Sequence, residues 1–352
     1  MFRFRLFSYE RIQSRISTLK MLWVALLVLA MNSGFAQEKP SASGDANTTV
    51  PSLKVKPARI APSAQTAMML AAASAGSRIV AVGERGVVLL SDDAGKSFHQ
   101  AASVPISATL TSVHFIDTKN GWAAGHWGAI LKTGDAGETW QLLRSDTKVD
   151  QPLFSIYFKD ARNGWAAGLW SLLLSTSDGG ATWQSVSLPV PAGESKADRN
   201  LFAIFSDQEG GLAITAERGT IVHSADGGSS WTYIDTGYKG SLWAGTVLQD
   251  GTWMVGGLRG TMLRSADHGK TWHSSPTGTK SSLTGIMQAK NGAVIAVGFD
   301  GVMLTSRDNG MTFSIKQRPD RASITAAVLA QDLNPVTFSQ SGPMKDVGDT
   351  VN

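Results

Sequence analysis

Short apolar segments alternate with Gly- and Asp-rich turns along most of the chain, and residues 121–140 show this pattern most clearly. The segment, GWAAGHWGAILKTGDAGETW, predicts two short strands joined by the turn His126-Trp127, then a tight turn and a third strand. The same spacing recurs in segments that end at Trp183 and Trp272. A unit of short antiparallel strands therefore repeats along the chain.

Six tight turns fit one template, Ser/Thr-x-Asp-x-Gly-x-Ser/Thr-Trp/Phe, and we call them the aspartate turns. Their aspartates are Asp93, Asp135, Asp178, Asp226, Asp267 and Asp308. Successive aspartates lie 42, 43, 48, 41 and 41 residues apart. Periods of this size, with several short strands in each unit, predict an all-β propeller with one four-stranded blade per repeat.

The innermost strand of each blade is predicted separately, because an apolar residue begins an apolar stretch 25 residues before each aspartate. These residues are Met68, Leu110, Leu153, Leu201, Leu242 and Leu283. Another step of 41 residues reaches Ile324, which begins a seventh stretch. In this last repeat, Gly342 lies where the other repeats have the second glycine of their turn, and Asp349 lies where they have the turn aspartate.

The sequence therefore predicts seven blades within a single propeller domain, 53–349. Six blades are contiguous, and the last is shared between Leu53–Lys56 and Ile324–Val347. Strands from both termini would then close the ring and leave no open sheet edge.

The composition of the aspartate turns has a structural explanation. Asp accepts bonds from backbone N–H groups two or three residues on, and Gly137 can take the positive φ of such a turn. Trp140 buries its ring against the blade. We interpret the six aspartates as structural, since every blade needs a turn whereas a catalytic residue is needed once. The template resembles the Asp-box of bacterial neuraminidases, S-x-D-x-G-x-T-W.

The residues that join the second and third strands differ most between repeats. Such turns need only Gly, Asn or small polar residues, whereas these contain Trp and Arg, which are enriched in interface hot spots. We predict a partner-binding rim, with a mobile crossover, Pro189–Arg199, on the same face. The rim residues are Arg85, His126, Trp127, Trp170, Arg218, Arg259 and Asp300. Alternatively, Glu84–Arg85 and Glu217–Arg218 form local pairs and the Trp rings pack on their own blades.

Residues 1–36 are typical of a secretory signal peptide. A basic segment precedes the apolar run 21–31, and the small residues Gly34 and Ala36 occupy positions −3 and −1 of a cleavage site after Ala36. The run is shorter than the roughly 20 residues of a spanning helix, although an uncleaved anchor remains an alternative. Residues 37–52 predict a flexible linker. We expect export to the periplasm, or to the thylakoid lumen in a photosynthetic host.

The formal net charge of +4 lies in the first 20 residues, where five basic and one acidic residue give 5 − 1 = +4. The rest sums to 4 − 4 = 0, and a neutral body does not predict nucleic-acid binding. The chain has no cysteine, and its six histidines lack a metal-ligand spacing. We therefore expect no metal and no cofactor, and a monomer.

Asp-box propellers include sialidases, and a sialidase would carry further sequence motifs. The family pattern has Arg-Ile-Pro, three arginines and a Tyr–Glu pair; the nearest match here is Arg59-Ile60 followed by Ala61-Pro62. Tyr157 is predicted on an inner strand, but no glutamate is close to it in sequence. We predict no enzymatic activity, because a fold alone does not confer its commonest function. A glycan-binding or sialidase-like glycoside hydrolase is the alternative, and a small-ligand binder using the axial channel is a third hypothesis.

The leader, the seven repeats, the segments Asn120–Gly125 and Asn163–Gly168, and the S-x-D-G-G-x-T-W turns together resemble the photosystem II stability and assembly factors and their bacterial relatives. The resemblance implies a lumenal, non-enzymatic propeller that binds a membrane protein or membrane-complex subunit through an arginine-rich surface. It makes Arg85, Arg218 and Arg259 candidates. Two blades depart from it by having Trp at this position. Relatives in non-photosynthetic bacteria resemble envelope proteins that accompany membrane transport systems.

Overall fold

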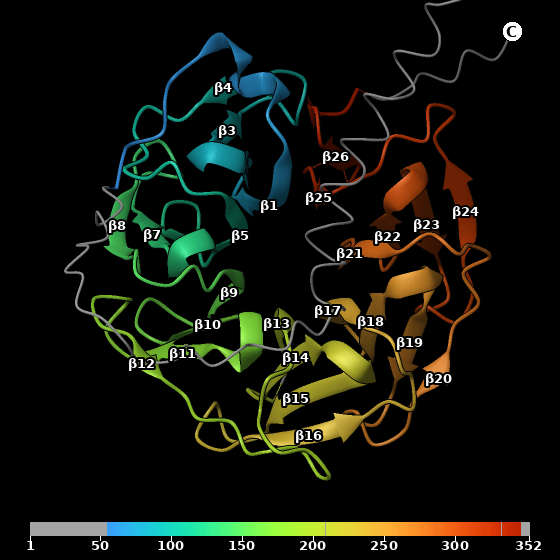
Figure 1. Cartoon of the computed structure of the whole chain (residues 1–352). Coiled ribbons are helices and arrows are strands. Elements are labelled where there is room, and N and C mark those ends of the chain that lie inside the picture. The colour runs from blue at the N-terminus through green and yellow to red at the C-terminus, as the bar shows by residue number, and fades with distance from the viewer. Residues whose placement is uncertain (1–54, 208, 332, 346–352) are drawn as a thin grey trace, which may run out of the picture. The chain divides into compact units, whose positions relative to one another are not determined.

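Seven antiparallel sheets surround one axis in the computed structural model, which describes residues 55–207, 209–331 and 333–345 (Figure 1). Six sheets have four strands and the seventh has three in the described part of the chain. The first strand of each sheet lies nearest the axis, and the chain passes from one sheet to the next around the ring. The prediction of a seven-bladed β-propeller is confirmed.

The first four blades have the same order of elements, with a short 3-10 turn between the second and third strands. The first comprises β1 (Met69–Ala75), β2 (Arg78–Gly83), η2 (Glu84–Gly86), β3 (Val88–Ser91) and β4 (His99–Gln100). The second comprises β5 (Leu110–Phe115), β6 (Gly121–Gly125), η3 (His126–Gly128), β7 (Ile130–Thr133) and β8 (Gln141–Arg144). The third comprises β9 (Leu153–Phe158), β10 (Gly164–Gly168), η4 (Leu169–Ser171), β11 (Leu173–Thr176) and β12 (Gln184–Ser185). The fourth comprises β13 (Leu201–Ser206), β14 (Leu212–Ala216), η5 (Glu217–Gly219), β15 (Thr220–Ser224) and β16 (Thr232–Asp235).

The remaining blades follow the same plan until the last. The fifth comprises β17 (Leu242–Val247), β18 (Trp253–Gly257), η6 (Leu258–Gly260), β19 (Met262–Ser265) and β20 (His273–Ser274). The sixth comprises β21 (Leu283–Gln288), β22 (Val294–Gly298), η7 (Phe299–Gly301), β23 (Val302–Ser306) and β24 (Ser314–Gln317). The seventh comprises β25 (Ala326–Leu329), β26 (Pro335–Ser339) and β27 (Gly342–Pro343), and η1 (Pro62–Thr66) precedes the first blade.

The predicted starts of the inner strands agree closely with the structure. Five inner strands begin at the predicted leucine. In the first blade β1 begins at Met69, one residue after the predicted Met68, and in the last blade β25 begins two residues after Ile324. Gly342 follows the turn between β26 and β27, as predicted, and has φ 93°.

The closure of the ring differs from the prediction. Val55 and Lys56, the described part of the predicted outer strand, lie outside any strand, and Leu53 is outside the described residues. The N-terminal segment instead contacts the last blade through η1. The two backbones approach so closely that a Cβ on Gly342 would lie 1.9 Å from the carbonyl oxygen of Gln65. The first and last blades also meet directly, where the Thr325 hydroxyl donates to the carbonyl of Met69 (2.5 Å). Within the described residues, packing and side-chain bonds rather than a shared strand therefore join the first and last blades.

The second strands form the interior between blades. All five residues of β6 and of β10, both GWAAG, are buried. Trp122 of β6 stacks on Phe158 of the next blade, with ring centroids 3.7 Å apart, and donates to the carbonyl of Gly179 (3.1 Å). The repeated Gly-Trp-Ala-Ala-Gly segment thus supplies one large ring and small neighbours that let adjacent blades pack closely.

The aspartate turns are built by hydrogen bonds that repeat from blade to blade. In the third blade Asp178 accepts bonds from the Thr182 amide (2.9 Å) and hydroxyl (2.6 Å), and from the Thr176 hydroxyl (2.8 Å). The amide lies four residues after the aspartate, rather than the two or three predicted. These donors lower the pKa of Asp178 to about 2.

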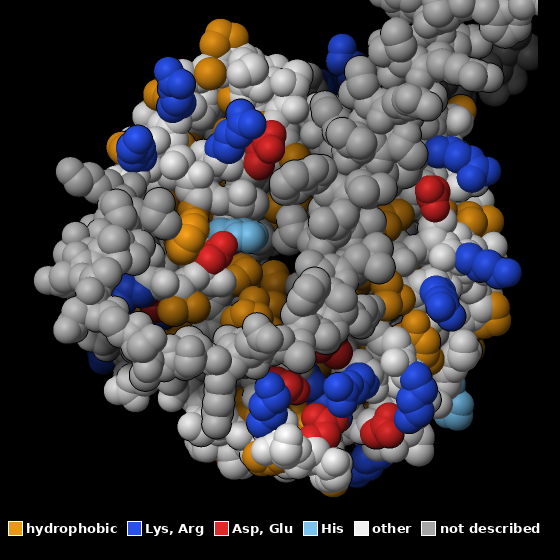
Figure 2. Space-filling view, in the orientation of Figure 1, with side chains coloured by type: hydrophobic (Ala, Val, Ile, Leu, Met, Phe, Trp, Pro, Cys, Tyr) orange, Lys and Arg blue, Asp and Glu red, His pale blue; other side chains and the backbone are white. Residues whose placement is uncertain are grey.

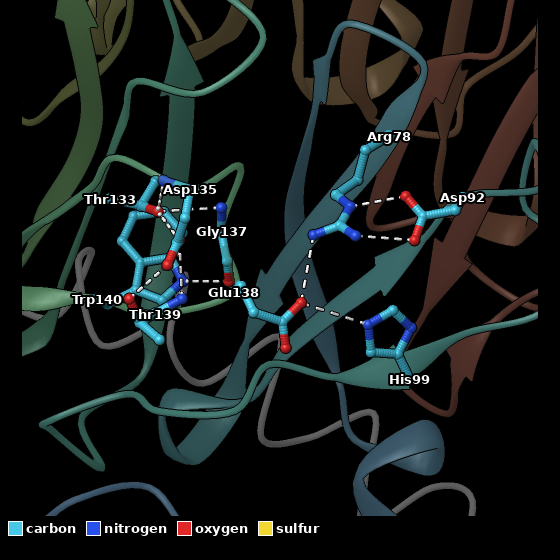
Figure 3. Close-up of polar contacts among 9 residues, drawn as sticks. All are labelled: Arg78, Asp92, His99, Thr133, Asp135, Gly137, Glu138, Thr139 and Trp140. Atoms are coloured by element: carbon cyan, nitrogen blue, oxygen red, sulfur yellow. Dashed lines mark hydrogen bonds and ion pairs between the residues drawn. The ribbon is translucent and has the colours of Figure 1, made fainter.

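Figure 3 shows how one aspartate turn is joined to the neighbouring blade. Arg78 of the first blade binds both oxygens of Asp92 (2.7 and 2.9 Å) and also Glu138, which lies in the turn of the second blade (3.3 Å). Glu138 Oε2 lies 3.6 Å from Nε2 of His99. Two carboxylates thus share one guanidinium across the blade boundary.

Among the described residues, no helix has the length and apolar character to cross a membrane.

Replacing Asp178 with Asn should lower stability most at neutral pH. A carboxyl with a depressed native pKa stabilises the fold above its unfolded value of about 3.9 and loses that contribution as the pH falls toward its native value. Urea unfolding at several pH values between 7 and 2 should show the difference between wild type and variant shrinking below about pH 4. A difference that stays constant with pH would contradict this assignment.

Candidate functional site: one face of the propeller

The six 3-10 turns η2 to η7 lie on the face that is toward the viewer in Figure 1. The middle residue of each has left-handed backbone geometry, with φ between 54° and 59°. These residues, here called the turn ring, are Arg85, Trp127, Trp170, Arg218, Arg259 and Asp300. Positive φ is uncommon for Arg and Trp and costs about 1–3 kcal/mol, whereas glycine adopts it readily. The fold therefore does not select these side chains.

The backbone of the turn ring is fixed by the crossover that leads into the next blade. In four turns a crossover side chain accepts the N–H of the left-handed residue. These pairs are Trp127–Asp150 (2.7 Å), Trp170–Asn200 (3.0 Å), Arg259–Ser282 (3.3 Å) and Asp300–Ser323 (3.2 Å). Each such bond joins two blades and orients the side chain between them.

The local ion pairs considered from the sequence do not form. Glu84 accepts the N–H of Met68 (3.2 Å), and Glu217 accepts bonds from the amide N–H (3.1 Å) and Nδ2 (2.9 Å) of Asn200. In the described part of the chain, neither glutamate pairs with the arginine that follows it. Both glutamates instead link their turn to the start of an inner strand.

Arg218 is held by the longest crossover. One carboxylate oxygen of Glu194 accepts bonds from Arg218 (2.8 Å) and from Arg199 (2.6 Å). The bond from Arg199 is the main reason that the pKa of Glu194 is lowered. Arg199 is only 13% exposed and lies 5.5 Å from the ring of Tyr233. The crossover expected to be mobile is thus braced internally by Arg199 and anchored through Glu194 to Arg218 of the fourth blade.

The predicted rim residues differ in exposure. Arg85, Trp170, Arg218 and Arg259 are exposed, and Trp170 has 59% of its surface accessible. His126, Trp127 and Asp300 are half-buried. Nδ1 of His126 lies 3.2 Å from Asp150, and Asp300 accepts the hydroxyl of Ser281 (2.7 Å). The structure thus brings all seven to one face, on which Figure 2 shows charged side chains over the blades and hydrophobic ones nearer the centre.

The prediction missed a set of aromatic residues inside the turn ring. In six blades the pairing of the first and second strands is interrupted by a bulge near the start of the inner strand. Three consecutive blades have an aromatic residue there, namely Phe154, Phe202 and Trp243. The ring of Phe154 stacks on Phe202 with centroids 5.9 Å apart, and Trp243 packs edge-on against Phe299 of η7 at 5.8 Å. We call these four residues the aromatic arc.

The residues of the alternative hydrolase hypothesis do not join this face as a set. Tyr157 packs its ring against His114 (5.0 Å) and Trp165 (6.5 Å) on the second and third blades. A ring nitrogen of His114 contacts the carbonyl of Phe158 (3.0 Å), and burial lowers the pKa of this histidine. Arg59 uses its carbonyl to accept a bond from Gln100 (2.9 Å). These contacts give Tyr157, His114 and Arg59 a structural explanation.

Residues 135–242 match the family model of the photosynthesis system II assembly factor YCF48. The predicted resemblance to the photosystem II assembly factors is confirmed. The matched residues run from the aspartate turn of the second blade to the first residue of β17. No curated protein sequence matches the chain.

Solved structures of YCF48 share the fold. The structure titled "YCF48 bound to D1 peptide" has 16% identity and a TM-score of 0.64, and the match covers 82% of this chain and 98% of that one. YCF48 from Cyanidioschyzon merolae has 14% identity and a TM-score of 0.61, with 82% and 96% covered. The WD40 propeller domain of Doa1 is equally similar, with 14% identity, a TM-score of 0.61, and 78% and 90% covered. At such identities the similarity shows the fold alone.

Proposed function

We propose that this chain is a non-catalytic propeller that binds a protein partner and acts as an assembly or accessory factor for a membrane complex. The turn ring carries the proposal, because large Arg and Trp side chains occupy five of its six left-handed positions, which the fold would fill more readily with glycine. The YCF48 structure bound to a D1 peptide supports it, since a propeller of the same fold is there in contact with a peptide.

The geometry of the turn ring suits protein binding. Bonds from the crossovers fix the backbone at Trp170 and Arg259, so that this backbone is already ordered before a partner binds. Aromatic and arginine side chains of this kind dominate the energetics of protein interfaces. Arg259 and Arg85 form no ion pair in the described part of the chain. They are therefore open to a carboxylate of the partner.

The cellular location belongs to the same proposal. The predicted signal peptide, which lies outside the described residues, favours the periplasm, or the thylakoid lumen in a photosynthetic host. The partner would be a subunit of photosystem II in a photosynthetic host, and a subunit of a membrane transport system elsewhere.

Removal of the turn-ring side chains should abolish partner capture. The full-length chain would be crosslinked in its host envelope, and the membrane protein that it captures would be identified by mass spectrometry. We expect the variant R85A/W127A/W170A/R218A/R259A to recover at least tenfold less of that protein, because several hot-spot side chains are lost together.

The matched control is M311A/I315A, which removes two exposed apolar side chains from the outer part of the sixth blade (53% and 47% accessible). It should capture the same protein as wild type. Undiminished capture by the five-residue variant would contradict the proposal, provided that both variants unfold in urea at the wild-type midpoint.

A further inference from the structure

The bulged position near the start of the inner strand has a structural role in three blades. The hydroxyl of Thr111 donates to the carbonyl of Leu153 (2.5 Å), and that of Thr284 to the carbonyl of Ile324 (2.8 Å). Thr325 of the last blade makes the corresponding bond to Met69 (2.5 Å). In each case a threonine joins its blade to the first residues of the next.

The third, fourth and fifth blades lack this threonine bond in the described part of the chain. Phe154, Phe202 and Trp243 occupy the bulged position and make no such bond among the described residues, yet these blades have the same strand order as the other four-stranded blades. All three rings are half-buried and so remain partly accessible. The fold therefore does not require them, and three aromatic residues in consecutive blades indicate a surface selected for contact.

The aromatic arc lies directly inside the turn ring. The turns η4 and η5 contact the inner strands β13 and β17 of the following blades. Phe202 therefore lies beside the turn that carries Trp170, and Trp243 beside the turn that carries Arg218. Arg259 belongs to the same blade as Trp243. Rings and guanidinium groups thus share one continuous part of the face.

The acceptor groups around the arc already hold protein donors. Six carboxylates and side-chain amides of the turns and crossovers on this face each hold a donor from the protein itself. These groups are Glu84, Asp150, Glu194, Asn200, Glu217 and Asp300. What the face offers to a ligand is therefore apolar ring surface together with arginine donors.

This chemistry favours a peptide over a glycan. Sugar hydroxyls need protein acceptors as well as donors, and the acceptors here already hold protein donors. A peptide with large apolar side chains would cover the rings, and a nearby carboxylate would pair with an arginine. Arg259 is better placed for that pair than Arg218, because Glu194 already accepts from Arg218.

Resting on the proposed function, we infer that the aromatic arc binds an extended segment of the protein partner that carries large apolar side chains beside a carboxylate, and that Arg259 receives the carboxylate. The arc recognises the apolar side chains and the turn ring surrounds the segment. An acidic segment without apolar side chains is a poor ligand, since it leaves the rings in water.

Binding would be measured with three probes and the mature chain. The first is a synthetic peptide of about ten residues, long enough to span ~30 Å, with alternating Phe or Leu and two Glu residues. The second has Ser in place of each Phe or Leu, and the third is an oligosaccharide of N-acetylglucosamine. The variants are F202T, W243T and R259A, with M311A as the control. Threonine occupies the equivalent position in the second and sixth blades, so F202T and W243T keep a residue that the bulge accommodates.

We expect the apolar peptide to bind, with affinity about tenfold weaker for F202T and for W243T and unchanged for M311A. R259A should also weaken binding of the apolar peptide, because its Glu residues lose their arginine partner. Equal binding of the serine peptide, unchanged affinity of the arc variants, or binding of the oligosaccharide alone overturns the inference, as does failure of the apolar peptide to bind.

The failure of this inference is distinguishable from that of the proposed function. If partner capture is lost in the turn-ring variant but normal in F202T and W243T, the protein-binding role stands and the arc is not its recognition element. If capture is normal in the turn-ring variant, the proposed function itself fails.

Discussion

Replacing Trp122 with alanine is expected to lower the free energy of unfolding by about 3–5 kcal/mol. Trp122 is fully buried, stacks on Phe158 at 3.7 Å, and donates to the carbonyl of Gly179. Its loss would leave a cavity between the second and third blades and an acceptor without its donor. Both effects destabilise, because the surrounding blades cannot close the gap without breaking their own strand pairing.

The matched control is Trp170→Ala, since Trp170 is 59% exposed on the turn ring. Its loss should change stability by no more than about 0.5 kcal/mol. Urea unfolding followed by circular dichroism, with fitted midpoints and slopes, would compare the two variants. Similar losses for the two would show that the boundary between blades does not depend on this ring.

Replacing Gly168 with alanine should lower the free energy of unfolding by about 1–3 kcal/mol. Its φ of −166° suits any residue, so the constraint is spatial. A Cβ would lie 2.1 Å from the carbonyl oxygen of Pro152 and 2.8 Å from Cα of Leu153, both of which are backbone atoms. The end of β10 and the start of β9 would therefore have to move apart.

The fourth blade supplies the control, because Ala216 stands at the equivalent position. Its φ is −142°, and the fourth blade accommodates its Cβ opposite Leu201, where the pairing is irregular as far as Ile204. Ala216→Gly should therefore cost no more than about 1 kcal/mol. Thermal unfolding would test both variants, and a larger loss for Ala216→Gly would refute the steric explanation.

The blade count could be predicted from the sequence because its signal is local. A tight turn needs an acceptor, a residue of positive φ and small donors at fixed offsets, so the aspartate template repeats in every full blade. The inner strands follow from the same period. Met68 was one residue early because the β1–β2 hairpin is one residue shorter than the others: Met69 and its partner Gly83 are 14 positions apart, whereas Leu110 and Gly125 are 15 apart.

Features that depend on contacts between distant segments were harder to predict. Val55 and Lys56 were assigned to a strand from their offset alone, whereas η1 forms the described N-terminal contact with the last blade. Glu217 adjoins Arg218 in sequence, but its carboxylate turns back to Asn200. Sequence proximity was therefore a poor guide to pairing.

The candidate site was predicted in part. The turn ring could be found because its residues violate the preferences of a tight turn, and the structure adds their left-handed geometry. The aromatic arc was missed because its members lie in different repeats and meet only in the ring. One signal was present, since Phe154, Phe202 and Trp243 each directly follow the predicted first leucine of an inner strand.

The way the ring closes has a consequence for how such a chain can be cut. The two ends of the described chain meet at the last blade, where η1 lies against β27 and a threonine hydroxyl reaches Met69. The second and sixth blades make the same threonine bond to the blade that follows them, so this junction resembles two others in the ring and could equally lie within a continuous chain. A circular permutant that joined these ends and opened an exposed crossover would keep every blade whole and retain the same face.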